Sequence, residues 1–450
     1  MKIVIIGAGE IGFDLANVLS TEKHDVIVMD HDKECLSRVS SSLDVLPIEG
    51  NATSVKDLVK AQVGDCDILI SVTSIDEVNM ISGMIGKRLG AKMVIARIRS
   101  DDFTDKDSPI TPTDLGIDVM IHPELSAAQE ISQLLKRSSA SDVINLADGR
   151  MQLIGIRLEK NSPLIGKSLI QYSEDYPDLT FRVVAIVRRG RTIIPDGSIK
   201  LQNYDQIFVL ATTEDINSIV KTTGKKETEL NSIMIAGGSD MGAMLARILC
   251  ADKTKEWSIK LIEPDYEKAE NLAIEMKDVM VLHGNPTDPD LLATEGISDM
   301  DAFIAVTDDE ESNIISCLMG KHLEVKKTVA LVSKPDFIPL AQTIGLDAVV
   351  NKKIAASNEI HRYVHQGRVL SVTELRGIKA EVIELEATPN SKVTKKPVKK
   401  LSLPSGSLIG GIVSDDKVEI ATGNTQINGG DRVIVFCVPS DIDKVTKLFQ

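Results

Sequence analysis

KIVIIGAGEIG, at residues 2–12, places a run of β-forming aliphatic side chains directly before three glycines with the spacing G-x-G-x-x-G. Each glycine has its own use where a strand turns into a helix. Gly7 permits the tight turn, Gly9 lets the backbone approach a pyrophosphate, and Gly12 lets the helix pack closely on the strand. A diphosphate would lie at the N-terminus of that helix, where unpaired N–H groups and the helix dipole favour negative charge.

The next apolar segment strengthens this prediction. VIVMD at residues 26–30 ends in Asp30, at the distance of about 20 residues that is typical of a dinucleotide-binding unit. The Asp30 carboxylate can accept hydrogen bonds from ribose hydroxyls and would repel a 2′-phosphate, which favours NAD over NADP. The glycines and the acid together predict a nucleotide-binding strand–helix–strand unit.

Two further strand ends carry polar residues. The segment Gly50-Asn51-Ala52-Thr53 is expected to close the third strand, and Thr73 the fourth. The carboxyl ends of parallel strands form the edge at which open α/β sheets bind ligands. Asn51 and Thr53 either bond the adenine or its ribose, or cap the next helix.

Arg97 ends the segment MVIAR, where its guanidinium either faces phosphate or forms a surface ion pair. Glu77 and Asn79 lie on the helix predicted after Thr73, where a solvated face is expected. The predicted first site comprises Gly7, Ala8, Gly9, Glu10, Ile11, Gly12, Asp30, Asn51, Ala52, Thr53, Thr73 and Arg97.

The chain is an internal repeat. KIVIIGAGEIG recurs as SIMIAGGSDMG at residues 232–242, and LGIDVMIHPELSAAQEI recurs as IGLDAVVNKKIAASNEI. Each copy continues into a shorter segment punctuated by Pro and Gly, such as TIIPDG. The sequence therefore predicts four domains, at residues 1–137, 138–225, 226–367 and 368–450.

The fold class follows from the order of the predicted elements. In the large domains, short apolar runs alternate with helical patterns, which indicates a parallel sheet covered by helices on both faces. We therefore expect an α/β chain with two Rossmann-like doubly wound sheets, each followed by a small α+β domain.

The second large domain carries an altered glycine motif. Gly237, Gly238 and Gly242 are present, but Ser239 occupies the middle glycine position, where a side chain obstructs backbone approach to phosphate. Glu263 takes the place of Asp30, and Leu331 takes the place of Arg97. The second site is predicted to comprise Gly237, Gly238, Ser239, Gly242 and Glu263, and to be either selective or vestigial.

Composition excludes several classes of protein. The formal net charge of −15 disfavours diffuse attraction to nucleic acid or anionic lipid. No segment approaches the roughly 18 uncharged apolar residues of a membrane span, so a cytosolic protein is expected. The lysine-rich stretch KVTKKPVKK, at residues 392–400, either touches an anionic partner or forms an ordinary loop.

Catalytic and metal-binding motifs are missing from the sequence. There is no Tyr-x-x-x-Lys pair, Walker A motif or G-x-S-x-G elbow, and the histidines lack metal-ligand spacing. His122 and its counterpart Asn351 differ between the copies, which argues against a shared chemical role. We therefore expect a binding protein with no catalytic residues and no metal, and its scattered cysteines are expected to be reduced.

This four-part order, with GAGEIG at the start of the first unit and Asp-Gln-Ile-Phe-Val-Leu in the first small one, resembles the TrkA family of potassium-uptake subunits. The resemblance implies tandem KTN or RCK nucleotide-binding domains alternating with TrkA-C domains. It also implies a peripheral cytoplasmic homotetramer that binds NAD(H), ATP or ADP and gates a TrkH-type potassium-translocating membrane protein. The family often has Asp where Asn51 stands.

Two other functions remain open from the residues. One is an NAD-dependent oxidoreductase, which turnover of NADH with a carbonyl substrate would reveal. The other is a soluble nucleotide sensor for a different protein partner, which association with a potassium transporter would exclude.

Overall fold

The computed structural model describes residues 1–100, 103, 109–225, 228–334, 337–364, 369–374, 380–414 and 417–450. The chain forms two compact units. Unit 1 contains Met1–Ser126 and Lys352–Val364, and unit 2 contains Ala127–Asn351 and His365–Gln450.

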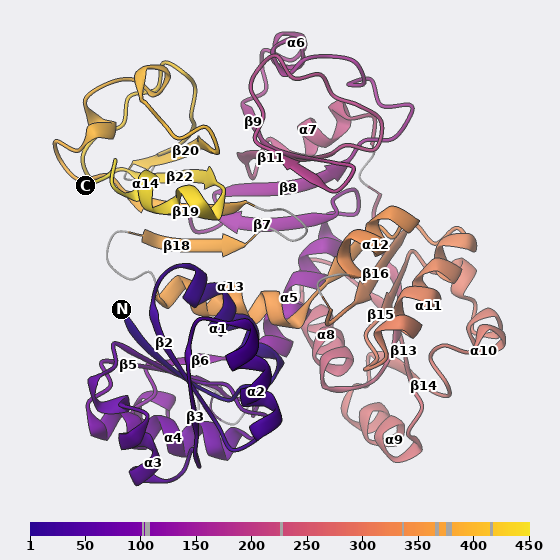
Figure 1. Cartoon of the computed structure of the whole chain (residues 1–450). Coiled ribbons are helices and arrows are strands. Elements are labelled where there is room, and N and C mark those ends of the chain that lie inside the picture. Colours follow the sequence, from indigo (N-terminus) through magenta and orange to yellow (C-terminus); the bar gives the residue numbers. More distant parts are fainter. Residues whose placement is uncertain are drawn as a thin grey trace. The chain divides into compact units, whose positions relative to one another are not determined.

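Unit 1 is built on a six-stranded parallel sheet of order β3-β2-β1-β4-β5-β6 (Figure 1). This is the strand order of a dinucleotide-binding Rossmann fold. The strands are β1 (Lys2–Ile6), β2 (Asp25–Asp30), β3 (Leu46–Glu49), β4 (Ile68–Ser71), β5 (Met93–Arg97) and β6 (Val119–Ile121).

Helices cover both faces of this sheet. Ile3 and Ile5 belong to the core on one face, and Val4 and Ile6 to the core on the other, because side chains alternate along a strand. The helices are α1 (Glu10–Thr21), α2 (Lys33–Ser42), α3 (Val55–Lys60) and α4 (Asp76–Leu89), with short 3-10 turns η1 (Val63–Asp65) and η3 (Pro112–Leu115). Asp32 caps α2 by accepting from the backbone N–H groups of Glu34 and Cys35.

A helix from the second sequence repeat completes unit 1. Helix α13 (Lys352–Val364) packs against α1, and its Ile360 and Val364 are buried in the same core cluster as Ile3 and Leu15. Helix α5 (Pro123–Lys136), its counterpart in the first repeat, begins in unit 1 and continues in unit 2 from Ala127 onward.

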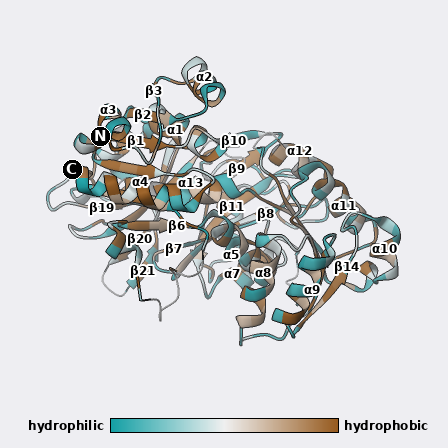
Figure 2. Ribbon diagram, turned by 90° about the horizontal axis from the view of Figure 1, so that it is seen from below, coloured by the Kyte–Doolittle hydropathy of each residue, from teal (hydrophilic) through white to brown (hydrophobic). Residues whose placement is uncertain are grey.

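Unit 2 contains a second parallel sheet, of order β14-β13-β12-β15-β16-β17. Its strands are β12 (Ser232–Ala236), β13 (Ser258–Glu263), β14 (Val279–His283), β15 (Ala302–Ala305), β16 (Lys327–Leu331) and β17 (Ala348–Val350). Its helices are α8 (Asp240–Ala251), α9 (Tyr266–Glu275), α10 (Pro289–Thr294), α11 (Glu310–His322) and α12 (Phe337–Ile344), with η4 (Ile297–Asp299). Helices such as α9 carry both hydrophilic and hydrophobic turns, as expected for elements with one buried face (Figure 2).

Two small antiparallel domains also belong to unit 2. The first has the strand order β10-β9-β11-β8-β7, and the second β18-β19-β22-β20-β21. The first contains β7 (Asp142–Leu146), β8 (Met151–Arg157), α6 (Leu169–Asp175), β9 (Phe181–Arg188), β10 (Arg191–Ile193), β11 (Gln206–Thr212) and α7 (Ile216–Thr222). The second contains β18 (Val369–Glu374), β19 (Glu381–Glu386), η5 (Lys392–Thr394), η6 (Val398–Lys400), β20 (Ser407–Ser414), β21 (Lys417–Ile420), β22 (Arg432–Cys437), η7 (Pro439–Asp441) and α14 (Ile442–Thr446).

The two small domains share one hydrophobic core. Leu153 and Phe208 of the first are buried in the same cluster as Val382 and Phe436 of the second. At the edge of this core, Arg432 forms ion pairs with Glu384 at 2.6 Å and with Asp148 at 2.9 Å. The sequence repeat predicts the two domains but not their packing against each other.

The predicted fold class is confirmed, with its two Rossmann-like sheets, small α+β domains and internal repeat. The domain boundaries stay predictions, and those at residue 226 and at residues 367–368 lie outside the described part of the chain.

Candidate functional site

The predicted site residues of the first copy gather at one edge of the unit 1 sheet. Gly7 follows β1 and donates its backbone N–H to Met29 of β2, and Gly50 follows β3 and donates to the carbonyl of Asp30. Thr73 follows β4 at the same edge. Because all these strands are parallel, their carboxyl ends and the residues after them form one rim.

The three glycines meet three different steric requirements. Gly7 has a φ of +104°, and a Cβ atom there would lie 3.0 Å from the backbone nitrogen of Thr73. A Cβ on Gly12 would lie 1.8 Å from the carbonyl oxygen of Gly7, so only glycine allows α1 to start at this distance. A Cβ on Gly9 would have no other heavy atom within 4 Å. Gly9 is therefore unconstrained by the fold and leaves open space above the start of α1.

The Asp30 carboxylate anchors the glycine loop. Its Oδ2 accepts the backbone N–H of Ala8 at 2.6 Å, and its Oδ1 accepts that of Asp32 at 2.9 Å. His31 Nδ1 lies 3.0 Å from the same Oδ1. Oδ2 has a second lone pair, so this arrangement retains acceptor capacity for a ribose hydroxyl.

Asn51 and Thr53 form a turn of their own. Asn51 Oδ1 accepts both the backbone N–H and the hydroxyl of Thr53 at 2.9 Å. The side chain that caps α3 belongs to Ser54, which accepts the N–H of Asp57. Of the two alternatives for Asn51 and Thr53, capping of this helix is therefore wrong. A hollow of about 410 Å³ opens beside the turn, lined by His31, Glu49, Gly50, Asn51 and Lys60.

Asn79 is fully buried, so the expectation of a solvated position for this residue is wrong. Its Oδ1 accepts the backbone N–H of Thr73 at 2.8 Å and the Thr73 hydroxyl at 2.7 Å. Its Nδ2 donates to the carbonyls of Thr73 and Arg97. Asn79 thereby ties the end of β4 to the end of β5. Glu77 is exposed, as expected.

Arg97 makes a largely buried ion pair rather than the surface pair considered from the sequence. Its Nη2 donates to Glu124 Oε1 at 2.8 Å. Burial alone would raise the pKa of Glu124, but a hydrogen bond from His122 and the Arg97 charge lower it to about 2. His122 Nδ1 lies 3.5 Å from Glu124 Oε2 and 3.2 Å from the backbone nitrogen of Leu125, and its Nε2 lies 3.0 Å from the carbonyl oxygen of Arg99.

The remaining predicted residues of the first site support the loop. Ala8 is fully buried, Glu10 is exposed at the first position of α1, and Ile11 and Ala52 pack against the cores on the two sheet faces.

The second copy repeats the loop geometry with different side chains. Gly237 has a φ of +113°, and a Cβ on Gly242 would lie 1.9 Å from its carbonyl oxygen. Ser239 folds its hydroxyl back to donate to the carbonyl of Val306 at 3.3 Å. The buried Glu263 accepts the N–H of Asp265, as Asp30 accepts that of Asp32. Leu331 is buried, without the charge that Arg97 brings.

Sequence reasoning missed the Asn79 tie, although the repeat carries its signal. Asn313 is also fully buried, and it bonds Thr307 and the carbonyl of Leu331 as Asn79 bonds Thr73 and Arg97. In both copies an asparagine follows the threonine after the fourth strand at the same distance, which indicates that both asparagines bond the backbone at the ends of neighbouring strands. His122 and Asn351 likewise share one role, since Asn351 donates to the carbonyl of Ser333.

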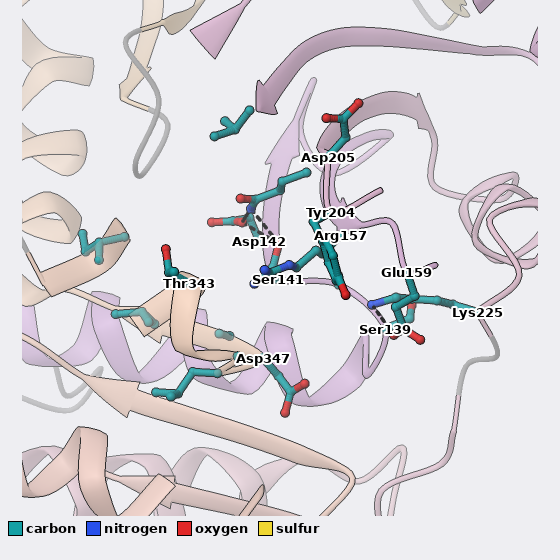
Figure 3. A pocket seen from close by; sticks show the side chains of 18 of the residues that line it. Ser139, Ser141, Asp142, Arg157, Glu159, Tyr204, Asp205, Lys225, Thr343 and Asp347 are labelled. Atoms are coloured by element: carbon teal, nitrogen blue, oxygen red, sulfur yellow. Dashed lines mark hydrogen bonds and ion pairs between the residues drawn. The ribbon is translucent and has the colours of Figure 1, made fainter. Parts of the chain in front are cut away.

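A larger cavity, of about 950 Å³, lies within unit 2 between the first small domain and the second Rossmann sheet (Figure 3). Charged residues that line the cavity form ion pairs with one another: Lys225 with Glu159 at 3.6 Å, and Lys321 with Asp347 at 2.5 Å. Lys327, a buried residue of the cavity wall, donates to the backbone carbonyls of Ser138 and Ala140. These contacts join the two domains.

No group of metal-ligating side chains is found among the described residues. The five cysteines are free thiols. In the parts of the chain that the structure covers, no helix is long and apolar enough to cross a membrane. The lysine-rich stretch at 392–400 forms two short 3-10 turns, and Lys399 donates to Asn424.

Comparison with known protein families matches the whole repeat. Residues 3–123 and 233–352 match the TrkA-N domain, and residues 153–224 and 382–450 match the TrkA-C domain. Among solved structures, the GsuK RCK domain has a TM-score of 0.61 at 17% identity, covering 100% of this chain and 94% of that one. The GsuK channel bound to NAD has a TM-score of 0.62 at 17% identity, covering 100% and 78%. At this identity the likeness shows the fold.

Several related proteins match this chain along its full length. The Trk system potassium uptake protein TrkA homolog 2 of Methanosarcina mazei is 34% identical, covering 100% of both chains. The Trk system potassium uptake protein TrkA of Vibrio alginolyticus is 32% identical, covering 100% of this chain and 99% of the relative. With both domains matched twice in alternating order and these relatives matched from end to end, the chain belongs to the TrkA family of Trk system potassium uptake proteins.

Proposed function

We propose that this chain is a nucleotide-binding regulatory subunit of a potassium uptake system. In this proposal an adenine nucleotide, NAD(H) or ATP and ADP, binds at the glycine loop of the first Rossmann unit. The residues of the predicted first site form this binding site, and those of the second site bind more weakly or more selectively.

The observation that carries the proposal is the open backbone surface at Gly9, next to the Asp30 carboxylate. A Cβ atom on Gly9 would have no atom of another part of the protein within 4 Å, so the fold does not require glycine there. A diphosphate at the N-terminus of α1 does require it, because the phosphate oxygens must reach backbone N–H groups. Asp30, at the end of β2, then binds the ribose. The family and the RCK-like fold support the same ligand class.

The proposed mechanism is regulation without catalysis. Nucleotides differ in phosphate number and charge, so each stabilises a different geometry of a subunit assembly. Only such differential affinity shifts the equilibrium of a transport protein. We propose that the chain assembles as a homotetramer at the cytoplasmic face of the membrane, on a TrkH-type potassium-translocating protein. Two similar Rossmann units per chain allow a ring from few subunits.

Calorimetric titration of the purified full chain with NADH, ADP and ATP tests the ligand site. We expect saturable binding that an Asp30→Ala variant loses, and that the matched Glu263→Ala variant of the second copy retains. Absence of binding of all three nucleotides to the unaltered chain would overturn the proposal. Equal loss in both variants would contradict the assignment to the first copy.

Potassium flux tests the partner. Vesicles that contain a TrkH-type protein should change their potassium flux when the chain is added, and the change should depend on the nucleotide present. Flux that is the same with and without the chain would exclude this partner. Consumption of NADH with a carbonyl substrate would instead favour an oxidoreductase.

A further inference from the structure

Lys353 pairs with the first residue of α1, directly after the first glycine loop, although it belongs to the second sequence repeat. It is the second residue of α13, which packs into unit 1 through Ile360 and Val364. The helix is also fixed by a 2.7 Å hydrogen bond from the Ser126 hydroxyl to Glu359 Oε2. The position of Lys353 in unit 1 is therefore set by a packed, hydrogen-bonded helix.

The ammonium of Lys353 lies at the N-terminus of α1. Its Nζ is 3.3 Å from Oε2 of Glu10, the first residue of that helix and the neighbour of Gly9. The Lys353 side chain is 13% exposed, whereas that of Glu10 is 65% exposed. Burial raises the pKa of the nearby Asp14 carboxyl, and the Lys353 charge opposes that rise. A mostly buried cation thus pairs with a largely exposed carboxylate one residue after Gly9.

The repeat shows that this lysine is specific to the second copy. Alignment of the two copies places Lys353 at the position of Glu124, and Leu331 at the position of Arg97. In the first copy the acid is neutralised within unit 1 by its arginine. The second copy has Leu331 in place of that arginine and a cation in place of the acid. The charge at this position is therefore opposite in the two copies.

We propose that Lys353 binds the phosphate oxygens of the nucleotide at the first glycine loop, and that Glu10 holds it when no phosphate is present. This inference rests on the proposed nucleotide site and adds to it a phosphate-sensing residue. A carboxylate at a helix N-terminus occupies the same favourable field as a phosphate, so Glu10 is the internal competitor for the ligand. An ammonium–phosphate hydrogen bond is charge-assisted and stronger than a neutral one.

The lysine would discriminate between nucleotides by charge. A terminal phosphate carries nearly two negative charges at neutral pH, whereas each phosphate of the NAD diphosphate bridge carries about one. Lys353 should therefore contribute most to ATP, less to ADP and least to NADH.

Titration calorimetry of the full chain at constant ionic strength, with ATP and NADH as probes, tests the role of Lys353. In Lys353→Met, which keeps the apolar stem, we expect ATP affinity to fall about tenfold or more, and NADH affinity to change about threefold or less. In Glu10→Gln, ATP affinity should rise, because the competing carboxylate is gone. The matched control is Lys352→Met, one residue away on the same helix, which should leave the ATP-to-NADH affinity ratio within about twofold of the unaltered chain.

The outcomes separate this inference from the proposed function. If Lys353→Met keeps the ATP-to-NADH ratio while Asp30→Ala abolishes both ligands, Lys353 is no phosphate ligand and the nucleotide site stands. If Lys353→Met weakens both ligands equally and lowers the melting temperature, the lysine has only a packing role and the inference is overturned. If the unaltered chain binds neither nucleotide, the proposed function itself fails.

Discussion

A Cβ atom on Gly238 would lie 2.8 Å from Oε2 of Glu263 and 2.9 Å from its Cβ. The corresponding pair in the first copy is Ala8 and Asp30, in which the backbone N–H of Ala8 donates to the shorter acid at 2.6 Å. The two copies thus combine alanine with the short acid and glycine with the long one. The acid at the end of the second strand and the residue after the first loop glycine form one packing unit.

Gly238→Ala should therefore destabilise the second Rossmann unit. The added methyl overlaps Glu263 and lies 3.0 Å from Leu261 Cδ2, so overpacking should cost about 1 to 3 kcal/mol. Adding Glu263→Asp rebuilds the combination found in the first copy and should recover part of this loss. Urea unfolding of both single variants and the double variant measures the coupling, expected at above about 0.5 kcal/mol. If the change in the free energy of unfolding of the double variant equals the sum of the two single changes, the two residues do not form a packing unit.

Gly9 and Gly12 should separate binding from folding. Gly9→Ala adds a methyl that meets no protein atom, so the melting temperature should change little while nucleotide binding is lost. Gly12→Ala places a methyl 1.8 Å from the carbonyl oxygen of Gly7, so the unit should unfold or lose stability strongly. Thermal unfolding and NADH titration of the two variants check this contrast. Unchanged NADH binding in a folded Gly9→Ala variant would show that no phosphate lies at this backbone.

The parallel sheets could be predicted from the sequence because their signals are local. Apolar runs such as IVII and VIVMD, each followed by a helical pattern, determine strand type, and the repeat supplies the same evidence twice. Asp30 could be predicted because the chain brings it to the end of β2 at a fixed distance from the glycines.

The position of α13 could not be predicted in the same way. Its buried residues Ile360 and Val364 suit a helix packed on either sheet, and sequence order assigns it to the second copy. Its partner is decided by packing between distant segments. The burial of Asn79 was also missed, because an asparagine near the start of a charged helix resembles a solvated residue until the strand ends it bonds are known.

Asn79→Ala should weaken both the fold and the ligand site of unit 1. The substitution leaves the Thr73 N–H without its acceptor and the Thr73 and Arg97 carbonyls without a donor, at a cost of about 2 to 4 kcal/mol. Asn79→Asp keeps the acceptor but places a buried carboxylate oxygen against the carbonyl oxygens of Thr73 and Arg97, so its cost at pH 7 should equal or exceed that of Asn79→Ala. Asn313→Ala is the matched control in unit 2 and should affect stability with less effect on nucleotide binding. Chemical unfolding and NADH titration of the three variants provide the measurements, and a cost near zero for Asn79→Ala would contradict the tie.

Glu124 should make stability depend on pH in the acid range. The pKa of Glu124 in the folded chain, about 2, lies below the ordinary glutamate value of 4.5, so the unfolded chain binds the proton more readily between these values. The stabilisation by Glu124 is present above about pH 4.5 and is lost as the pH falls toward 2. Between pH 4.5 and 3 the free energy of unfolding should fall by about 2 kcal/mol.

The Glu124→Gln variant should be less stable than the unaltered chain at pH 7, because Arg97 loses its charged partner. This difference in the free energy of unfolding should narrow below pH 4.5. Adding Arg97→Leu, the residue found at the equivalent position 331, should restore part of the loss because no unpaired charge remains. Urea unfolding from pH 7 to pH 3 would reveal this convergence, whereas parallel curves would show that the carboxyl titrates alike in the folded and unfolded chain.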